Sequence, residues 1–86
     1  MSRKVNWHED AWDDYIYWQG QDKKTLKKIN TLIKLSQRSP KEGAEPLKGN
    51  LEGFYSRHIN KKDVLVYGAD AESITIIQCR FHYSDQ

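Results

Sequence analysis

Three alternating, β-branched segments in the second half of the chain constrain its fold most strongly. They cover residues 53–59, 64–69 and 74–83, and two short turns, 60–63 and 70–73, separate them. Connections this short join neighbouring antiparallel strands, because a parallel pair needs a much longer crossover. The second half therefore predicts an antiparallel β-meander.

The first half carries one short strand candidate, residues 4–7, and two helical patterns. The first pattern begins at about Glu9, and the second begins after the N-capping Asp22 and ends before Pro40. Helices joined by so short a link form an antiparallel hairpin. The positions expected to face the core are Trp12, Tyr15, Ile16 and Gln19 in the first helix, with Ala11 and Trp18 beside them, and Leu26, Ile29, Leu32, Ile33 and Ser36 in the second.

These segments predict a single α+β domain over residues 1–86: a four-stranded sheet with the helical hairpin on one face and the other face free to bind. Side chains alternate between the faces of a strand. On the middle strand we expect Leu65 and Tyr67 to face the helices and Val64 to face outward. On the last strand the expected core side is Ile77, Phe81 and Tyr83, and the expected outward side is Arg80 and His82.

Composition limits the cellular setting and the partners. The single cysteine, Cys79, excludes an internal disulfide and is expected in the core, and no apolar run is long enough to cross a membrane, so we expect a soluble, cytoplasmic protein. The net charge is only +2, yet residues 23–48 hold eight bases against two acids. This excess favours a polyanionic partner, although a solvated helix face would carry the same lysines.

The remaining polar residues suit one kind of chemistry. The three histidines and the cysteine lack metal-ligand spacing, and no glycine-rich phosphate loop is present. A carboxylate among cations and imidazoles suits RNA cleavage without metal or cofactor: a base takes the 2′-hydroxyl proton, an acid protonates the leaving 5′-oxygen, and cations neutralise the phosphate. Ordinary surface roles are the alternative for each of these residues, which are Glu45, Lys48, Arg57, His58, Arg80 and His82.

Several segments, in the same order over nearly the whole chain, resemble the YoeB/Txe family of type II toxin–antitoxin toxins within the RelE-like superfamily. They include AWDDYIYW (residues 11–18), EPLK (45–48), SRHI (56–59) and HY (82–83). The resemblance implies a RelE-like fold and a ribosome-dependent mRNA endoribonuclease that cleaves in the A site and is silenced by a YefM-like antitoxin. It places the general base on Glu45, the general acid on His82, an active-site tyrosine on Tyr83 and a phosphate-binding lysine on Lys48.

Departures from the family pattern affect the expected cations. The family usually reads HRLVY where residues 63–67 read DVLVY, so Val64 stands in place of a transition-state arginine. The family's SRRI is SRHI, so His58 replaces another phosphate-contacting arginine. Losing one charge-stabilising donor typically lowers a rate roughly 10²–10³-fold. The candidates left to bind phosphate are Lys48, His58, Arg80 and Arg57, although alternation with His58 points Arg57 toward the other face.

Two function hypotheses therefore remain. In the first, the chain is an active ribonuclease whose partners are the ribosome, mRNA, a YefM-like antitoxin and, in a homodimer, a second copy. In the second, it cleaves weakly or not at all and mainly binds antitoxin, because Val64 lacks the charge. A DNA-binding protein is disfavoured, since no recognition-helix signature is present.

Overall fold

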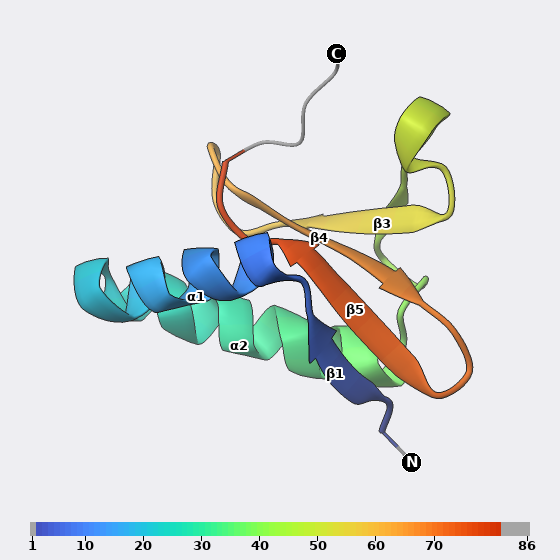
Figure 1. Ribbon diagram of the computed structural model, residues 1–86, viewed down its shortest axis with the longest axis horizontal. Coiled ribbons are helices and arrows are strands. Elements are labelled where there is room, and N and C mark those ends of the chain that lie inside the picture. The colour runs from blue at the N-terminus through green and yellow to red at the C-terminus, as the bar shows by residue number, and fades with distance from the viewer. Residues whose placement is uncertain (1, 82–86) are drawn as a thin grey trace.

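The computed structural model describes residues 2–81, and within them Figure 1 shows two α-helices packed on one side of a twisted sheet. The predicted α+β class and the helical hairpin are confirmed. The elements, in chain order, are β1 (Lys4–Trp7), α1 (Glu9–Gln21), α2 (Lys23–Arg38), β2 (Glu45–Pro46), the 3-10 helix η1 (Gly49–Leu51), β3 (Phe54–His58), β4 (Val64–Ala69) and β5 (Ser73–Gln78).

The sheet has five strands in the order β1-β5-β4-β3-β2, one more than predicted. β3, β4 and β5 form the expected antiparallel meander, and β1 runs parallel to β5. The additional strand is β2, in which Glu45 lies opposite Ser56 and Pro46 opposite Tyr55. A proline cannot donate to a ladder, so this segment looks like a loop in sequence, but at the sheet edge its missing N–H does no harm.

Local capping explains where the two helices begin. The Asp22 carboxylate accepts from the backbone amides of Lys24 (3.0 Å) and Thr25 (3.3 Å), so its predicted role as the N-cap of α2 is confirmed. At the start of α1 the His8 ring nitrogen Nδ1 accepts from the backbone amide of Asp10 at 3.1 Å. Both caps accept hydrogen bonds from backbone amides that have no acceptor inside the helix.

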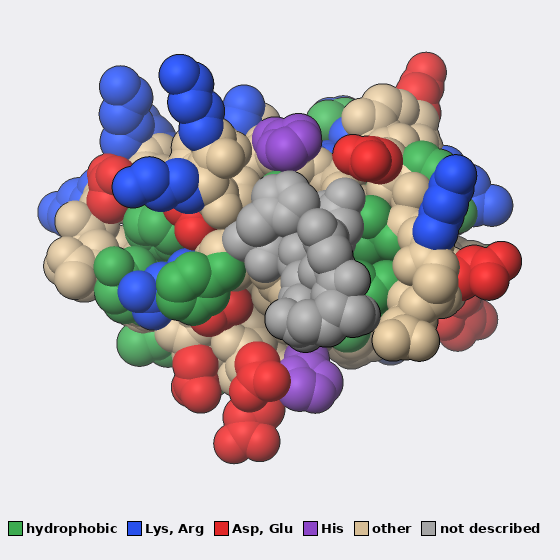
Figure 2. Space-filling model, turned by 90° about the horizontal axis from the view of Figure 1, so that it is seen from above, with side chains coloured by type: hydrophobic (Ala, Val, Ile, Leu, Met, Phe, Trp, Pro, Cys, Tyr) green, Lys and Arg blue, Asp and Glu red, His purple; other side chains and the backbone are tan. Residues whose placement is uncertain are grey.

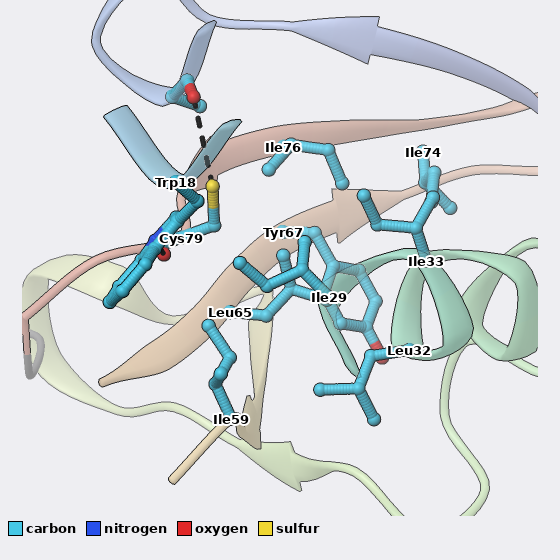
Figure 3. Close-up of a cluster of buried hydrophobic side chains, with 11 residues drawn as sticks. Trp18, Ile29, Leu32, Ile33, Ile59, Leu65, Tyr67, Ile74, Ile76 and Cys79 are labelled. Carbon is cyan, nitrogen blue, oxygen red and sulfur yellow. Dashed lines mark hydrogen bonds between the residues drawn. The ribbon is translucent and has the colours of Figure 1, made fainter. Parts of the chain in front are cut away.

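The main core lies between the helices and the sheet (Figure 3). The apolar stripe predicted for α2 is confirmed, since Ile29, Leu32 and Ile33 are buried there. The stripe predicted for α1 is confirmed only in part: Tyr15 packs against the core, but Trp12 is 45% exposed and Ile16 is 47% exposed. The buried positions of α1 are Ala11 and Trp18, which lie beside that stripe and are two helical turns apart.

A second, smaller cluster covers part of the sheet face opposite the helices, which we call the open face. Leu47, Val64 and Val66 are buried in it, with Leu51, Phe54 and Ile77 packed beside them. Val64 does lie opposite to the Leu65 side, as predicted, but it is fully buried rather than exposed. The segment that contains β2 and η1 thus closes over the middle of this face.

The last strand differs most from the prediction. β5 ends at Gln78 instead of continuing to residue 83, and its buried side is Ile74 and Ile76, whereas Ile77 packs on the open face. The β4–β5 ladder is irregular between Val66 and Tyr67. Val66 faces Gln78 and Tyr67 faces Ile76, which leaves Ile77 as an extra residue of β5. An extra residue in one strand reverses the alternation beyond it. Cys79 consequently returns to the main core, as predicted for that residue.

Candidate active site

Glu45, Ser56 and His58 lie together at the β2–β3 end of the open face. Glu45 is directly opposite Ser56, so both side chains leave the sheet on the same side, and His58 follows two residues later on β3. Glu45 and His58 are exposed, whereas Ser56 is buried. An open hollow of about 430 Å³ is lined by these three residues together with Leu32, Gly43, Ala44 and Arg57. A carboxylate and an imidazole are therefore accessible to a ligand at one edge of the sheet.

Arg57 and Tyr67 hold the loop that leads to Glu45. The Arg57 guanidinium donates to the backbone carbonyls of Ser39 (2.7 Å) and Glu42 (3.0 Å). Its Nε also donates to the Ser36 and Tyr67 hydroxyl oxygens, and the Tyr67 hydroxyl donates to the Pro40 carbonyl at 2.5 Å. Ser39 caps the C-terminus of α2, where the helix dipole favours a cation.

The two arginines among the predicted phosphate ligands both lie on the helix side. Arg57 is buried beneath the loop, pointing away from His58 as alternation predicts, and its Nε and Nη2 donate to protein oxygens. Arg80 follows the end of β5, and its guanidinium carbon lies 3.4 Å from the centroid of the Tyr17 ring in α1. Arg57 nevertheless lines the hollow beside Glu45, whereas Arg80 is not among the residues that line it.

Lys48 directly follows Leu47 of the apolar cluster on the open face, and Val64 lies within that cluster. Lys48 is exposed and precedes η1, directly after the buried Leu47. Val64 lies opposite His58 in the β3–β4 ladder. Lys48 and His58 are accordingly the predicted phosphate ligands that the structure leaves exposed, and His58 lines the hollow together with Glu45. Val64 is buried and contributes no charge.

Two predicted site residues, His82 and Tyr83, lie outside the described residues. The chain just before them is held by acidic side chains: Asp14 accepts from the backbone amide of Cys79 at 3.1 Å, and Asp63 accepts from that of Phe81 at 2.6 Å. Burial raises the pKa of Asp14 above its ordinary value, against the lowering effects of the Cys79 hydrogen bond and the Arg80 charge. Sequence reasoning missed Asp63, although its position in a turn directly before a strand is a usual place for a capping carboxylate.

Charge is distributed unevenly over the surface. Figure 2 shows acidic side chains gathered along the lower edge of that view and basic side chains at its upper left. Within residues 2–81, no group of three or more His, Cys, Asp or Glu side chains is arranged to hold a metal ion. In the same part of the chain, neither helix is long and apolar enough to cross a membrane.

Comparison with known proteins identifies the family. Residues 7–83 match the family model described as the YoeB-like toxin of bacterial type II toxin–antitoxin systems. This chain belongs to that family. The toxin YoeB of Escherichia coli K12 is 52% identical to it over 83 residues, which cover 93% of this chain and 99% of the relative. The match to the YoeB-like toxin family thus confirms the resemblance found in the sequence.

Solved structures of the family share the fold over almost the whole chain. The YoeB dimer from Staphylococcus aureus superimposes with a TM-score of 0.88 at 42% identity, covering 96% of this chain and 100% of that one. The YoeB–YefM complex from Staphylococcus aureus gives a TM-score of 0.85 at 41% identity, with the same coverage. The toxin fold of this chain is therefore that of the YoeB family.

Proposed function

We propose that this toxin is a ribosome-dependent endoribonuclease that cleaves mRNA in the ribosomal A site and thereby inhibits translation in the cytoplasm. The observation that carries the proposal is the position of Glu45 opposite Ser56, with His58 on the same open face beside an accessible hollow. Membership of the YoeB family adds support, since the match spans residues 7–83 and so includes Glu45, where the sequence resemblance implies a general base.

In the proposed reaction, Glu45 takes the proton of the 2′-hydroxyl, and the 2′-oxygen attacks the adjacent phosphorus. The bond to the 5′-oxygen breaks as His82 protonates that oxygen, leaving a 2′,3′-cyclic phosphate and a free 5′-hydroxyl. Tyr83 lies next to the general acid in the sequence. Lys48 and His58, both exposed, are proposed to stabilise the charged phosphorane. Arg80 remains a further candidate, although its guanidinium lies over Tyr17.

The test is primer extension on ribosomes programmed with a defined mRNA. We expect the wild-type protein to cleave and Glu45→Gln with His82→Gln to lose at least about a hundredfold in rate, because both proton transfers are removed. Lys41→Gln is the control, since Lys41 is an exposed residue of the loop outside the proposed site. Full cleavage by the double variant would exclude the proposed roles.

A second candidate function is antitoxin binding with little cleavage. The burial of Val64 in an apolar cluster favours it, because no cation stands at this place in the site. A wild-type protein that binds a YefM-like antitoxin tightly yet leaves ribosome-bound mRNA intact would support this function and contradict the first.

The proposal includes a YefM-like antitoxin and a homodimer as partners. Its support is the family's Staphylococcus aureus structures, one titled as a dimer and one as a YoeB–YefM complex. We expect the Glu45→Gln, His82→Gln variant to keep antitoxin affinity within about threefold, because interfaces draw their energy from a few central contacts. Titration calorimetry measures this affinity, and light scattering after size exclusion gives the oligomeric state. A parallel loss of binding and cleavage would show that the two surfaces coincide.

A further inference from the structure

The segment 79–81, between the end of β5 and the proposed general acid, is held on one side by α1. The Cys79 amide donates to Asp14, and the Cys79 carbonyl accepts from the Trp18 indole nitrogen at 2.7 Å. The next residue, Arg80, lies over the Tyr17 ring. Both backbone groups of Cys79 and the side chain of Arg80 are thereby fixed to one helix.

The start of β4 holds the other side of the segment. The Phe81 amide donates to Asp63 Oδ1 at 2.6 Å, and the Phe81 carbonyl accepts from the Val64 amide at 3.0 Å. The Gln78 side-chain amide also donates to the Arg80 and Phe81 carbonyls. Both backbone polar groups of Phe81 are therefore bound, one of them by a charged acceptor.

Phe81 needs this support because its backbone is in an unfavourable conformation. Its φ angle is +66°, and it is the only non-glycine residue with positive φ in residues 2–81. A side chain other than glycine disfavours this left-handed region, which persists only where the surroundings impose it. The Phe81 ring is 59% exposed, so ring packing is a weak restraint and the backbone hydrogen bonds carry the constraint.

Asp63 is itself prearranged to receive the Phe81 amide. It is only 9% exposed, and the 60–63 turn is closed by Asn60 Oδ1, which accepts from the Asp63 amide at 2.8 Å. The Asp63 carbonyl in turn accepts from the amides of Ile59 and Asn60. The backbone of Asp63 is therefore already fixed, and the hydrogen bond from Phe81 to its carboxylate costs little further conformational entropy.

We propose that Asp63 is a positioning residue, which holds Phe81 in its left-handed conformation and so sets the direction in which the chain leaves Phe81, the residue before the proposed general acid. Its effect on cleavage rests on the proposed function. A general acid must approach the leaving oxygen to within hydrogen-bond distance, and a displacement of about 1 Å can lower a rate about a hundredfold.

The test compares Asp63→Ala, Asp63→Asn and the control Asp70→Ala. Asn retains the side-chain oxygen that accepts from Phe81, whereas Ala removes it. Asp70 has the same chemistry at the other end of β4: its Oδ1 accepts from the amides of Glu72 and Ser73, at 2.8 Å each. Asp70→Ala therefore removes a turn carboxylate from the same sheet without changing any contact of Phe81.

Two readouts separate positioning from simple loss of stability. In ribosome-dependent cleavage below the melting temperature, we expect Asp63→Ala to lower kcat about 10- to 100-fold while KM stays within about threefold. Asp63→Asn and Asp70→Ala should stay within about threefold of wild type in both constants. By NMR hydrogen exchange, protection of the Phe81 amide should fall at least about tenfold in Asp63→Ala alone.

Each other outcome overturns the inference. Unchanged kcat in Asp63→Ala, or an equal loss in Asp70→Ala, would show that Asp63 does not position the acid. Unchanged protection of the Phe81 amide would show that the hydrogen bond does not hold the segment. If the wild-type protein cleaves no RNA, the proposed function fails, and hydrogen exchange alone still decides whether Asp63 fixes Phe81.

Discussion

At the residue scale, Val64 decides how strongly charged the proposed site is. It lies opposite His58 and is fully buried beside Leu47 and Val66. An arginine there would extend its stem along this apolar cluster and bring its guanidinium to the open face. Paired, charge-assisted hydrogen bonds to phosphate oxygens then become available.

We therefore expect Val64→Arg to raise ribosome-dependent cleavage by at least about tenfold, a fraction of what one such donor supplies. The same change should lower the free energy of unfolding by about 1–3 kcal/mol, because a longer side chain enters a packed cluster. Primer extension and urea denaturation measure the two effects. Val64→Gln, long but uncharged, is the control, and an equal gain in that variant would exclude charge as the cause.

Cys79 makes a second prediction at this scale. Its side chain is fully buried and donates weakly to the Ala11 carbonyl. Burial, with smaller effects of Asp14 and Asp63, raises the pKa of the thiol from 9.0 to about 12. Because the thiolate is the reactive form, its fraction at pH 8 falls about a thousandfold.

We expect a disulfide reagent such as DTNB to modify the folded protein at pH 8 at least about a thousandfold more slowly than the urea-unfolded chain. Absorbance of the released thiol measures both rates. A folded protein that reacted within seconds would show that segment 79–81 opens readily, against the hydrogen bonds described for it.

At the element scale, the loop between α2 and β2 depends on one buried cation. Arg57 reaches the Ser39 and Glu42 carbonyls with a single nitrogen and two hydroxyl oxygens with another. A lysine has one nitrogen and cannot satisfy both groups of acceptors in the same fork geometry. The loop that delivers Glu45 to the sheet edge would then lose part of its anchoring.

Arg57→Lys should lower the free energy of unfolding by about 2–4 kcal/mol, since hydrogen bonds from a charged donor are lost and buried acceptors remain. Urea denaturation checks this value. Arg38→Lys makes the same chemical change at an exposed position in the last turn of α2 and should cost less than about 0.5 kcal/mol. Similar losses in both variants would contradict the anchoring role.

The elements with strong periodicity were predictable, and those set by tertiary contacts were not. The three-residue spacing of Ile29 and Leu32 identified the buried face of α2, and Asp22 identified its start. β2 was not predictable, because a two-residue strand containing Pro46 gains its structure only from pairing with β3. The end of β5 was missed because alternation cannot reveal an irregular ladder at Ile77.

The sequence predicted which residues belong to the candidate site better than it predicted how these residues are arranged. Family resemblance pointed to Glu45, Lys48 and His58, and the structure places Glu45 and His58 beside one hollow and leaves Lys48 exposed. The roles of Asp63 and Arg57 depend on hydrogen bonds to backbone groups 18 residues away in each case, at Phe81 and Ser39. No local pattern encodes such contacts.

At the scale of the whole molecule, β5 joins the two halves of the chain. It lies between β4 and β1, and its Ile74 and Ile76 are fully buried in the main core. Burying each of these side chains stabilises the fold by roughly 1.5–3 kcal/mol, a large part of the 5–15 kcal/mol typical of a whole domain.

A chain that ends at residue 72 should therefore be unfolded at 25 °C, with narrow amide dispersion in its NMR spectrum. A chain that ends at Phe81 keeps every described element and should retain a dispersed spectrum and a cooperative urea transition. A folded 72-residue chain would show that β1 and β4 can form a core without β5.

The parallel pairing of β1 with β5 also has a consequence for synthesis. Lys4 pairs with Ser73, so the first strand waits for a partner that is translated 69 residues later. Contacts between such distant segments form late, because the whole intervening chain must exist before the two strands can meet. A ribosome that has synthesised only β1 to β4 therefore carries a chain that lacks the central pairing of its sheet. We expect the nascent toxin to acquire its native sheet only after β5 has left the ribosome.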